Sequence, residues 1–346
     1  MINQNKQEMS YTYSMIGLFT LSLRLVVGWT YFSAFWRRLI LENKLIPDMP
    51  GYIGEKFNHF LPNALGIKPM IEYLVTNPDV LWWAMVIFTI IEGIVGLFIM
   101  LGLFTRLMSI GVFSLATGIL LGSGWLGTTC LDEWQIGILG AVAGFTIFLS
   151  GGGKYSLDYL LLPKMHWLRN QPWLVWLTSG ALPLRTGTIN KIAGIGAFAL
   201  LFLSLATNQI FHNGVWGKLH NKSVKPKIEI SDASIDHGKL SFTVYRVEGA
   251  DVYGSFLIGI TLKDKDGNVI LDKDAEALSR FPVSDIQNRY IAKVAPGKHS
   301  LVIPLGSKAG LTISDSSIAN LPKGSYTLIL TDVSGITWKE EFTYEE

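Results

Sequence analysis

The first two thirds of the chain consist of long apolar runs separated by shorter polar segments. Five runs are long enough, or nearly so, to cross a bilayer as helices of about 20 residues. They cover residues 15–36, 80–103, 107–121, 134–150 and 192–211. Glycine recurs in all of them, as is common where membrane helices pack closely. We therefore expect an α-helical membrane bundle with a four-helix core and a fifth spanning helix.

Two intervening segments are too apolar to be plain linkers. Residues 37–79 are mixed in character, and we expect them to fold back over the helix ends. Residues 172–184, "PWLVWLTSGALPL", are too short to span and are expected to lie at the membrane interface. A span at that position would move the C-terminus to the other side of the membrane.

From about residue 224 the pattern changes to strict alternation of apolar and polar positions. Stretches such as "KLSFTVYRV" and "GSYTLILTDVSGITWKEEFTY" are separated by Gly- and Pro-containing turns. This pattern predicts an all-β, antiparallel sandwich of immunoglobulin-like type. The expected domains are 1–170 for the four-helix membrane domain, 171–221 for the interfacial segment and fifth helix, and 222–346 for the β-sandwich.

Composition and charge agree with this division. Hydrophobic residues make up 49% of the chain and charged residues 16%, which is typical of a membrane protein. Residues 1–221 carry 14 Lys/Arg and 10 Asp/Glu, whereas the much shorter 222–346 carries 15 and 17. The β region must therefore meet water, and the net charge of +2 gives no indication of nucleic-acid binding.

The Lys/Arg bias of the short loops gives the orientation. With the N-terminus inside, seven Lys/Arg lie on the inner side and six on the outer side. This narrow margin predicts a multi-pass protein of the cell membrane with a cytoplasmic N-terminus and an extracytoplasmic C-terminal domain. A homo-oligomer is left open.

The only cysteine, Cys130, lies between two apolar runs in "WLGTTCLDEWQ". One reading is a small buried thiol that packs a helix end. The other is a nucleophile, because a helix N-terminus lowers a thiol pKa, although Asp132 and Glu133 would oppose that effect. Spacing alone leaves both readings open. A single cysteine also excludes an internal disulfide.

Charged residues inside or beside the apolar runs are the next candidates. Arg24 and Glu92 stand alone within two predicted helices, where they either pair to fix helix packing or line a path for protons or anions. Arg37 and Arg38 end the first run, either as a headgroup anchor or as a guanidinium fork for a small oxyanion.

Aromatic residues gather at the predicted helix ends. An interfacial belt explains most of them, while Trp29, Trp125 and Trp134 are candidates for lining a binding slot. The sequence has no CxxC, no haem-attachment motif, no phosphate loop and no dinucleotide fingerprint, and its histidines lack metal-ligand spacing. No metal, haem or flavin is therefore predicted.

Three segments resemble a known family. The patterns "LRLVVGWTYFSAFWRR", "EGIVGLFIMLGLFTR" and above all "WLGTTCLDEWQIG" resemble DoxD, the small subunit of thiosulfate:quinone oxidoreductase within the wider DoxX-like set of four-helix membrane proteins. This resemblance covers about residues 15–165. The β-rich tail and its preceding helix are similar to the partner subunit DoxA, so the chain resembles a DoxD–DoxA fusion.

The resemblance implies a two-electron reaction in which two thiosulfates give tetrathionate and a membrane quinone becomes quinol. The corresponding scaffold positions are Arg24, Glu92, Gly102 and Arg106, and those of the cysteine signature are Trp125, Cys130, Asp132, Glu133 and Gln135. Their roles are our own hypothesis. Cys130, Asp132, Glu133 and Glu92 are the expected catalytic residues, Arg37, Arg38, Arg24 and Trp125 bind thiosulfate, and Trp134 and Trp29 bind the quinone.

Two alternatives remain. The bundle is a non-enzymatic DoxX-like scaffold that displays a β-sandwich binding module, or it transports a sulfur oxyanion along Arg24 and Glu92. The first predicts that Cys130 is dispensable, and the second predicts thiosulfate exchange without quinone.

Overall fold

The computed structural model describes residues 12–47, 49, 51–127, 132–161, 164, 171, 173–250 and 255–344. These residues divide into two compact units. Unit 1 comprises the described residues within Met1–Ile53, Trp82–Gly124 and Asp132–His220. Unit 2 comprises those within Gly54–Leu81, Trp125–Leu131 and Asn221–Glu346.

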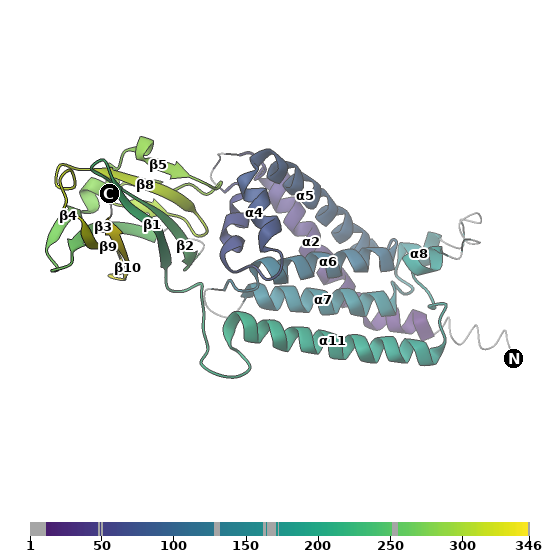
Figure 1. The fold of residues 1–346 in the computed structure, drawn as a ribbon. Coiled ribbons are helices and arrows are strands. Elements are labelled where there is room, and N and C mark those ends of the chain that lie inside the picture. Colours follow the sequence, from purple (N-terminus) through teal and green to yellow (C-terminus); the bar gives the residue numbers. More distant parts are fainter. Residues whose placement is uncertain are drawn as a thin grey trace. The chain divides into compact units, whose positions relative to one another are not determined.

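Unit 1 is helical (Figure 1). Its elements are α2 (Leu21–Phe35), the π-helical turn η1 (Trp36–Leu41), most of α5 (Pro78–Leu101), α6 (Thr105–Ser123), α7 (Asp132–Ser150), α8 (Leu157–Leu161), α10 (Leu174–Leu177) and α11 (Thr186–His212). Within the described residues, α5, α6, α7 and α11 are each long and apolar enough to cross a membrane. The expected helical membrane region is confirmed.

The first predicted span is broken. Helical residues Thr12–Phe19 and Leu21–Leu41 meet at an angle of 52°, and the pair counts as a fifth span only if both parts are taken together. At the break, the Thr20 hydroxyl donates to the Ile16 carbonyl and to Ser150 Oγ, at 3.2 and 3.0 Å. Hydropathy alone predicts one continuous span, because a bend in a helix does not change the apolar character of its residues.

The segment after Pro172 contains only the four-residue helix α10 among the described residues. A helix of that length rises about 6 Å, far less than a bilayer thickness. The expectation that this segment does not span is therefore in agreement with the structure.

Close packing of α2 against α5 depends on glycine. A Cβ on Gly93 would lie 2.7 Å from the Phe35 ring, and one on Gly28 would lie 2.8 Å from the Gly96 carbonyl oxygen. A side chain at either position would separate the two helices. The antiparallel contact aligns the end of α2 and η1 with the middle of α5.

Unit 2 contains an all-β domain of two antiparallel sheets. One has the order β1-β2-β8-β5, and the other β10-β9-β3-β7-β6 with β4 paired to β3. The strands are β1 (Lys227–Asp236), β2 (Lys239–Glu248), β3 (Ser255–Asp264), β4 (Val269–Lys273), β5 (Ile286–Asn288), β6 (Ala295–Pro296), β7 (Leu301–Ile303), β8 (Lys308–Ser314), β9 (Gly324–Asp332) and β10 (Thr337–Tyr344), with the short helix α12 (Ala275–Ser279) and the turn η4 (Val283–Asp285).

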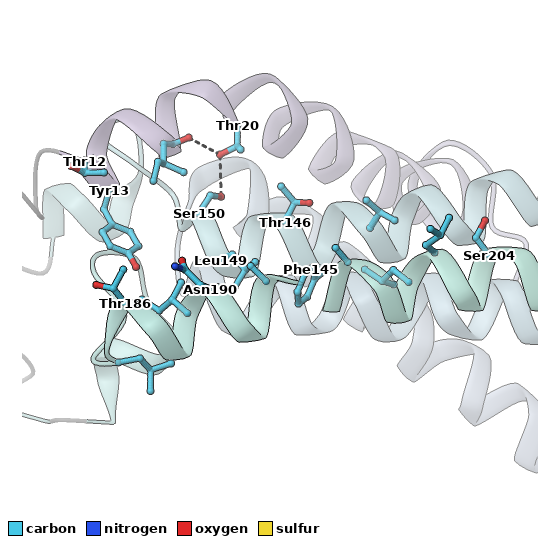
Figure 2. Close-up of a pocket in the computed structure, with 18 of the residues that line it drawn as sticks. Thr12, Tyr13, Thr20, Phe145, Thr146, Leu149, Ser150, Thr186, Asn190 and Ser204 are labelled. Carbon is cyan, nitrogen blue, oxygen red and sulfur yellow. Dashed lines mark hydrogen bonds between the residues drawn. The ribbon is translucent and has the colours of Figure 1, made fainter. Parts of the chain in front are cut away.

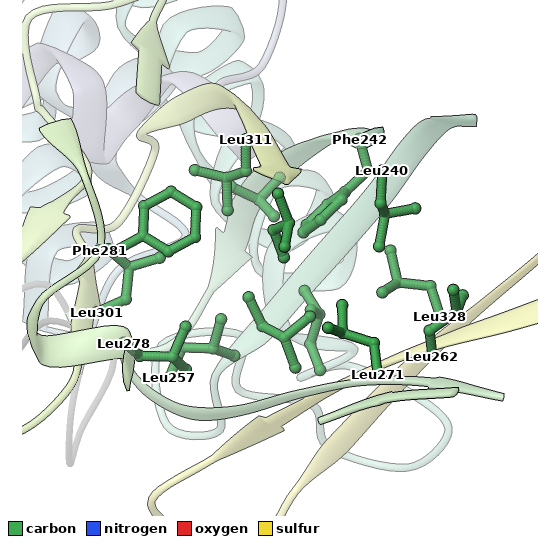
Figure 3. Close-up of a cluster of buried hydrophobic side chains, with 14 of the residues drawn as sticks. Leu240, Phe242, Leu257, Leu262, Leu271, Leu278, Phe281, Leu301, Leu311 and Leu328 are labelled. Carbon is green, nitrogen blue, oxygen red and sulfur yellow. The ribbon is translucent and has the colours of Figure 1, made fainter. Parts of the chain in front are cut away.

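The alternating positions seen in the sequence become the core of this domain. Leu240 and Phe242 from β2 face Leu257 and Leu262 from β3, and all four are at most 2% exposed (Figure 3). Two antiparallel sheets around one apolar core are consistent with the predicted sandwich.

Unit 2 also includes two segments from the helical part of the sequence. The first, Gly54–Leu81, contains α3 (Glu55–Phe60), η2 (Leu61–Asn63) and α4 (Lys68–Thr76). The second is the short segment that begins at Trp125, directly after unit 1 ends at Gly124. The Asn58 side chain donates to the Gly306 carbonyl and accepts from the Ala292 amide, both at 3.2 Å. Ser223 Oγ donates to the Gly127 carbonyl at 2.7 Å and accepts from the Gly127 amide at 2.8 Å. The expected boundaries 1–170, 171–221 and 222–346 remain a prediction about independent folding.

Candidate active site

A buried ion pair connects the end of the first span to the middle of α5. Arg38 Nη1 lies 2.8 Å from Glu92 Oε2 and donates to Thr89 Oγ1 at 3.2 Å. The Arg38 guanidinium carbon also lies 5.8 Å from the centre of the Phe88 ring. We call these four residues the Arg38–Glu92 site. Because the Glu92 and Arg38 side chains are only 5% and 16% exposed, mutual pairing is what makes their burial tolerable.

Helix periodicity assembles this site. Thr89 and Glu92 are three residues apart on α5 and therefore share a face. Arg38 lies in the π-helical turn η1, a wide turn often found at functional positions. Tyr31, seven residues before Arg38, is 5% exposed on α2.

The structure separates the two neighbouring arginines. Arg38 is engaged with Glu92, whereas Arg37 is exposed and its Nε donates to the Ser33 carbonyl at 3.2 Å. The predicted guanidinium fork therefore has one accessible member and one member held in an ion pair.

Arg24 is not the partner of Glu92, so the alternative in which these two charges pair is wrong. Its guanidinium donates to the Ile99 carbonyl at 3.3 Å and to the Tyr155 carbonyl at 2.6 Å. Carbonyls in the last turn of a helix lack intrahelical partners, and Ile99 is in the last turn of α5. Gly102, with φ +65°, is required here because a Cβ would collide with Arg24.

Arg106 performs the same task at the end of α7. It donates to the carbonyls of Phe148, Thr178 and Gly180, with a Phe148 distance of 3.1 Å and a Thr178 distance of 2.9 Å. Two of the four scaffold positions implied by the family resemblance, Arg24 and Arg106, thus bind carbonyls at helix ends. No sequence pattern distinguishes a cation that binds backbone carbonyls from one that binds substrate.

Asp158 is a structural carboxylate that the sequence analysis missed. It accepts from the backbone amides of Phe104 and Thr105, at 2.8 and 3.0 Å, and so caps the start of α6. Because Phe104 has φ +47°, the capped turn is one that few non-glycine residues adopt. The capping side chain lies more than 50 residues along the chain, beyond the reach of any local motif.

The cysteine signature is only partly described. Cys130 lies outside the described residues, and α7 begins at Asp132, as expected. Glu133 is partly buried in the first turn of α7. Trp125 is fully buried in unit 2, and its indole N–H donates to the Phe60 carbonyl at 3.1 Å.

The two tryptophans predicted to bind quinone have different surroundings. Trp134 is partly buried, and its indole N–H donates to Thr207 Oγ1 on α11 at 2.9 Å. Trp29 is 55% exposed on α2 and packs against Phe32 with ring centres 6.1 Å apart. No contact between Trp29 and Trp134 is found among the described residues.

Within the described part of the chain, no group of three or more His, Cys, Asp or Glu side chains is placed to hold a metal ion. Thr89 and Phe88 are site residues that the sequence analysis did not select. The spacing of Thr89 to Glu92 could have identified the first, whereas the second is recognised only when Arg38 is packed against α5.

Family models match nearly the whole chain. Residues 19–185 match the family described as TQO small subunit DoxD, and residues 211–341 match TQO small subunit DoxA. TQO denotes thiosulfate:quinone oxidoreductase, so these families imply a membrane oxidoreductase whose substrates include a quinone. The chain therefore belongs to the DoxD and DoxA families of TQO small subunits and carries both in one polypeptide, consistent with a DoxD–DoxA fusion.

Proposed function

We propose that this protein oxidises thiosulfate to tetrathionate and passes two electrons to a membrane quinone. The observation that carries the proposal is the Arg38–Glu92 site, a buried acid and base pair within the spanning helices of a chain that matches both TQO small subunits. Ionisable residues in spanning helices are costly and are commonly retained for ion, proton or substrate handling.

The sulfur chemistry centres on Cys130. Its thiolate joins the outer sulfur of one thiosulfate to form Cys–S–S–SO₃⁻, and the two electrons released reduce the quinone. A second thiosulfate then attacks the same outer sulfur, which releases tetrathionate and regenerates the thiolate. A single cysteine suffices because the other sulfur comes from the substrate.

Quinone reduction also consumes two protons. Glu92 is proposed to relay one: as the carboxylate partner of Arg38 it is ionised, so it first takes up a proton and then passes it to the quinone. Asp132 and Glu133, in the first turn of α7, are proposed to exchange protons near Cys130.

Thiosulfate binding is proposed for the exposed guanidinium of Arg37, with Arg38 and Arg24 acting through the field and the packing around the site. Trp125 is proposed to hold the start of the cysteine segment in place, since its buried indole N–H donates to the Phe60 carbonyl. Trp134 and Trp29 are the proposed aromatic contacts of the quinone.

For the orientation we keep a cytoplasmic N-terminus and an extracytoplasmic β domain. Unit 2 draws on segments that precede α5, follow α6 and follow α11. Segments that fold into one unit must lie on the same side of a membrane. The chain therefore has to cross and return through α5 and α6, and again through α7 and α11, so each pair is proposed to form a helical hairpin.

The test is thiosulfate-dependent quinone reduction by the full chain in membranes. Cys130→Ser is expected to abolish turnover while leaving expression and folding unchanged. Arg37→Ala removes one charge-assisted hydrogen bond, so it is expected to lower kcat/KM for thiosulfate by about ten- to a hundredfold. Lys56→Ala, a change of one cation in a segment of the other unit, serves as a charge-matched control. Native rates in both test variants would disprove the site assignment, and thiosulfate exchange without quinone would indicate a transporter.

A further inference from the structure

Unit 1 contains a long apolar groove. It has a volume of about 910 Å³ and is bounded by the Thr12–Phe19 helix, α7 and α11. Figure 2 shows its lining side chains along α11 from Thr186 to Ser204. At 1.5 Å per residue these 18 steps span about 27 Å, close to the thickness of the hydrocarbon core of a bilayer.

Helix packing leaves this space open. Near the end of α7 closer to Trp134, α11 is held by the Trp134–Thr207 hydrogen bond and by packing of Leu200 with Ala141. Gly196 then allows α11 to approach the Phe145 ring, which a Cβ at that position would strike. Small side chains at positions such as Ala193 and Ala197 leave the lining hollow.

The lining chemistry limits what can occupy the groove. The lining side chains are mostly apolar, with a few hydroxyl and amide groups, and none of them is charged. A phospholipid headgroup would bring a phosphate, which favours cationic partners. A long, neutral, single-chain molecule fits better.

We propose that the groove holds the isoprenoid tail of the quinone. This inference rests on the proposed function, which supplies a lipid-soluble quinone as the electron acceptor. The groove size is within the range of about 300–1,000 Å³ typical of small-molecule sites. Most of the groove surface comes from apolar side chains such as Val142, Leu149 and Leu201, which suit a hydrocarbon tail.

The redox ring lies at the Ser204 end of the groove. That end includes Ile138, which is six residues, or about 9 Å of helix rise, from the first residue of α7. The Trp134–Thr207 pair is one helical turn farther on both helices. Tyr13, Thr186 and Asn190 close the opposite end, as Figure 2 shows.

The experiment fills the groove and compares quinones with and without a tail. Ala193→Trp obstructs it from α11 and Thr146→Trp from α7. Ile195→Trp is the matched control, because Ile195 is on the same helix, is 70% exposed and does not line the groove. Each variant of the full chain is reconstituted in lipid nanodiscs, and thermal unfolding identifies any variant that fails to fold.

Both groove variants are expected to raise the KM for a decyl-tailed quinone at least about tenfold, since displacing even two methylene groups from an apolar site costs that much. The KM for tailless duroquinone and for thiosulfate is expected to stay at the native value, and Ile195→Trp is expected to change neither. An equal effect on both quinones, or no effect on either, overturns the proposal.

Photo-crosslinking with an azido-quinone gives a readout that does not require turnover. Labelling of α7 and α11 peptides, reduced by Ala193→Trp, supports the groove even if thiosulfate proves not to be the electron donor. Labelling of these peptides that is unchanged by Ala193→Trp and by excess decyl-tailed quinone would overturn the proposal.

Discussion

Three arginines in unit 1 direct their guanidinium groups to different kinds of acceptor. Arg24 and Arg106 bind backbone carbonyls near helix ends, whereas Arg38 binds the carboxylate of Glu92. Five N–H donors in a planar fork suit arginine to either task. Among the described hydrogen bonds of these three arginines, the one from Arg38 joins two ionisable side chains, and this is why we assign chemistry to that site and scaffolding to the others.

Removing one partner of the Arg38–Glu92 pair is expected to be more damaging than removing both. Arg38→Met leaves a buried carboxylate without its cation and is expected to cost about 3–5 kcal/mol of stability. The double variant Arg38→Met/Glu92→Leu is expected to recover most of that loss. Unfolding by denaturant in detergent micelles measures both.

Arg37→Met is the matched control for this measurement, because Arg37 is exposed and adjacent in sequence. It is expected to change stability by less than about 0.5 kcal/mol. A double variant less stable than Arg38→Met would show that the pair is a net source of stability rather than a compensated charge.

The sequence was sufficient to select Arg24, Arg38 and Glu92 as unusual, because charge in an apolar run is visible without coordinates. It was not sufficient to pair them. The register in which α2 packs against α5 decides which residues each charged side chain meets. That register is set by the close approach at Gly28 and Gly96 rather than by charge. Pairing across helices depends on such contacts, and no local pattern encodes them.

At the scale of elements, period-two alternation predicted the β region well because half of each strand faces one apolar core. The helices were harder to delimit. At the bend, the Thr20 hydroxyl donates to the Ile16 carbonyl and to Ser150 on α7, and the π-helical turn Trp36–Leu41 extends the helix past the predicted end of the run. Hydropathy identifies the apolar segments of a chain, but it gives no information on the backbone conformation within them.

The two sheets of the β domain are linked by an ion pair whose contribution to stability depends on pH. Lys273, the last residue of β4, lies 2.6 Å from Asp315, which follows β8. The Lys273 hydrogen bond lowers the pKa of Asp315 from 3.8 to about 2. A carboxyl with a depressed folded-state pKa stabilises the fold above its unfolded pKa, and this stabilisation is lost as pH falls toward the folded value.

Asp315→Asn is therefore expected to lower the melting temperature of the full chain at pH 7. The difference from the native chain is expected to hold down to about pH 5 and to shrink steadily from about pH 4 toward pH 2. Thermal unfolding followed by circular dichroism across this range provides the measurement. Lys273→Met should reproduce the loss at pH 7, and a pH-independent difference would contradict the assignment.

At the scale of the molecule, residues from the DoxD match and from the DoxA match share one compact unit. Asn58, fully buried, bonds Gly306 and Ala292, and Asn63 Nδ2 donates to the Val247 carbonyl at 2.9 Å. Tyr290 donates from its hydroxyl to Glu72 at 2.8 Å. The membrane-region loop between η1 and α5 is thus a structural part of the β-rich unit.

Asn58→Ala is expected to destabilise this unit because it leaves two buried backbone groups without a partner, at about 1–3 kcal/mol each. Limited proteolysis of the full chain measures the effect as faster cleavage within residues 54–76. Asn77→Ala is the control, since the Asn77 side chain bonds only Tyr73 and Thr76 among the described residues. Equal protection in the native chain and Asn58→Ala would show that the loop is held by apolar packing alone.

The long reach of these hydrogen bonds has a consequence for biogenesis. Asn58 and Gly306 are separated by 248 positions along the chain, so at a translation rate of about 5–20 residues per second the loop waits roughly 12–50 s for its partner. During that interval Asn58 and the apolar side chains of α3 and α4 lack the partners that bury them in the finished unit. A chain interrupted before the sandwich is made is therefore expected to expose this loop to proteolysis.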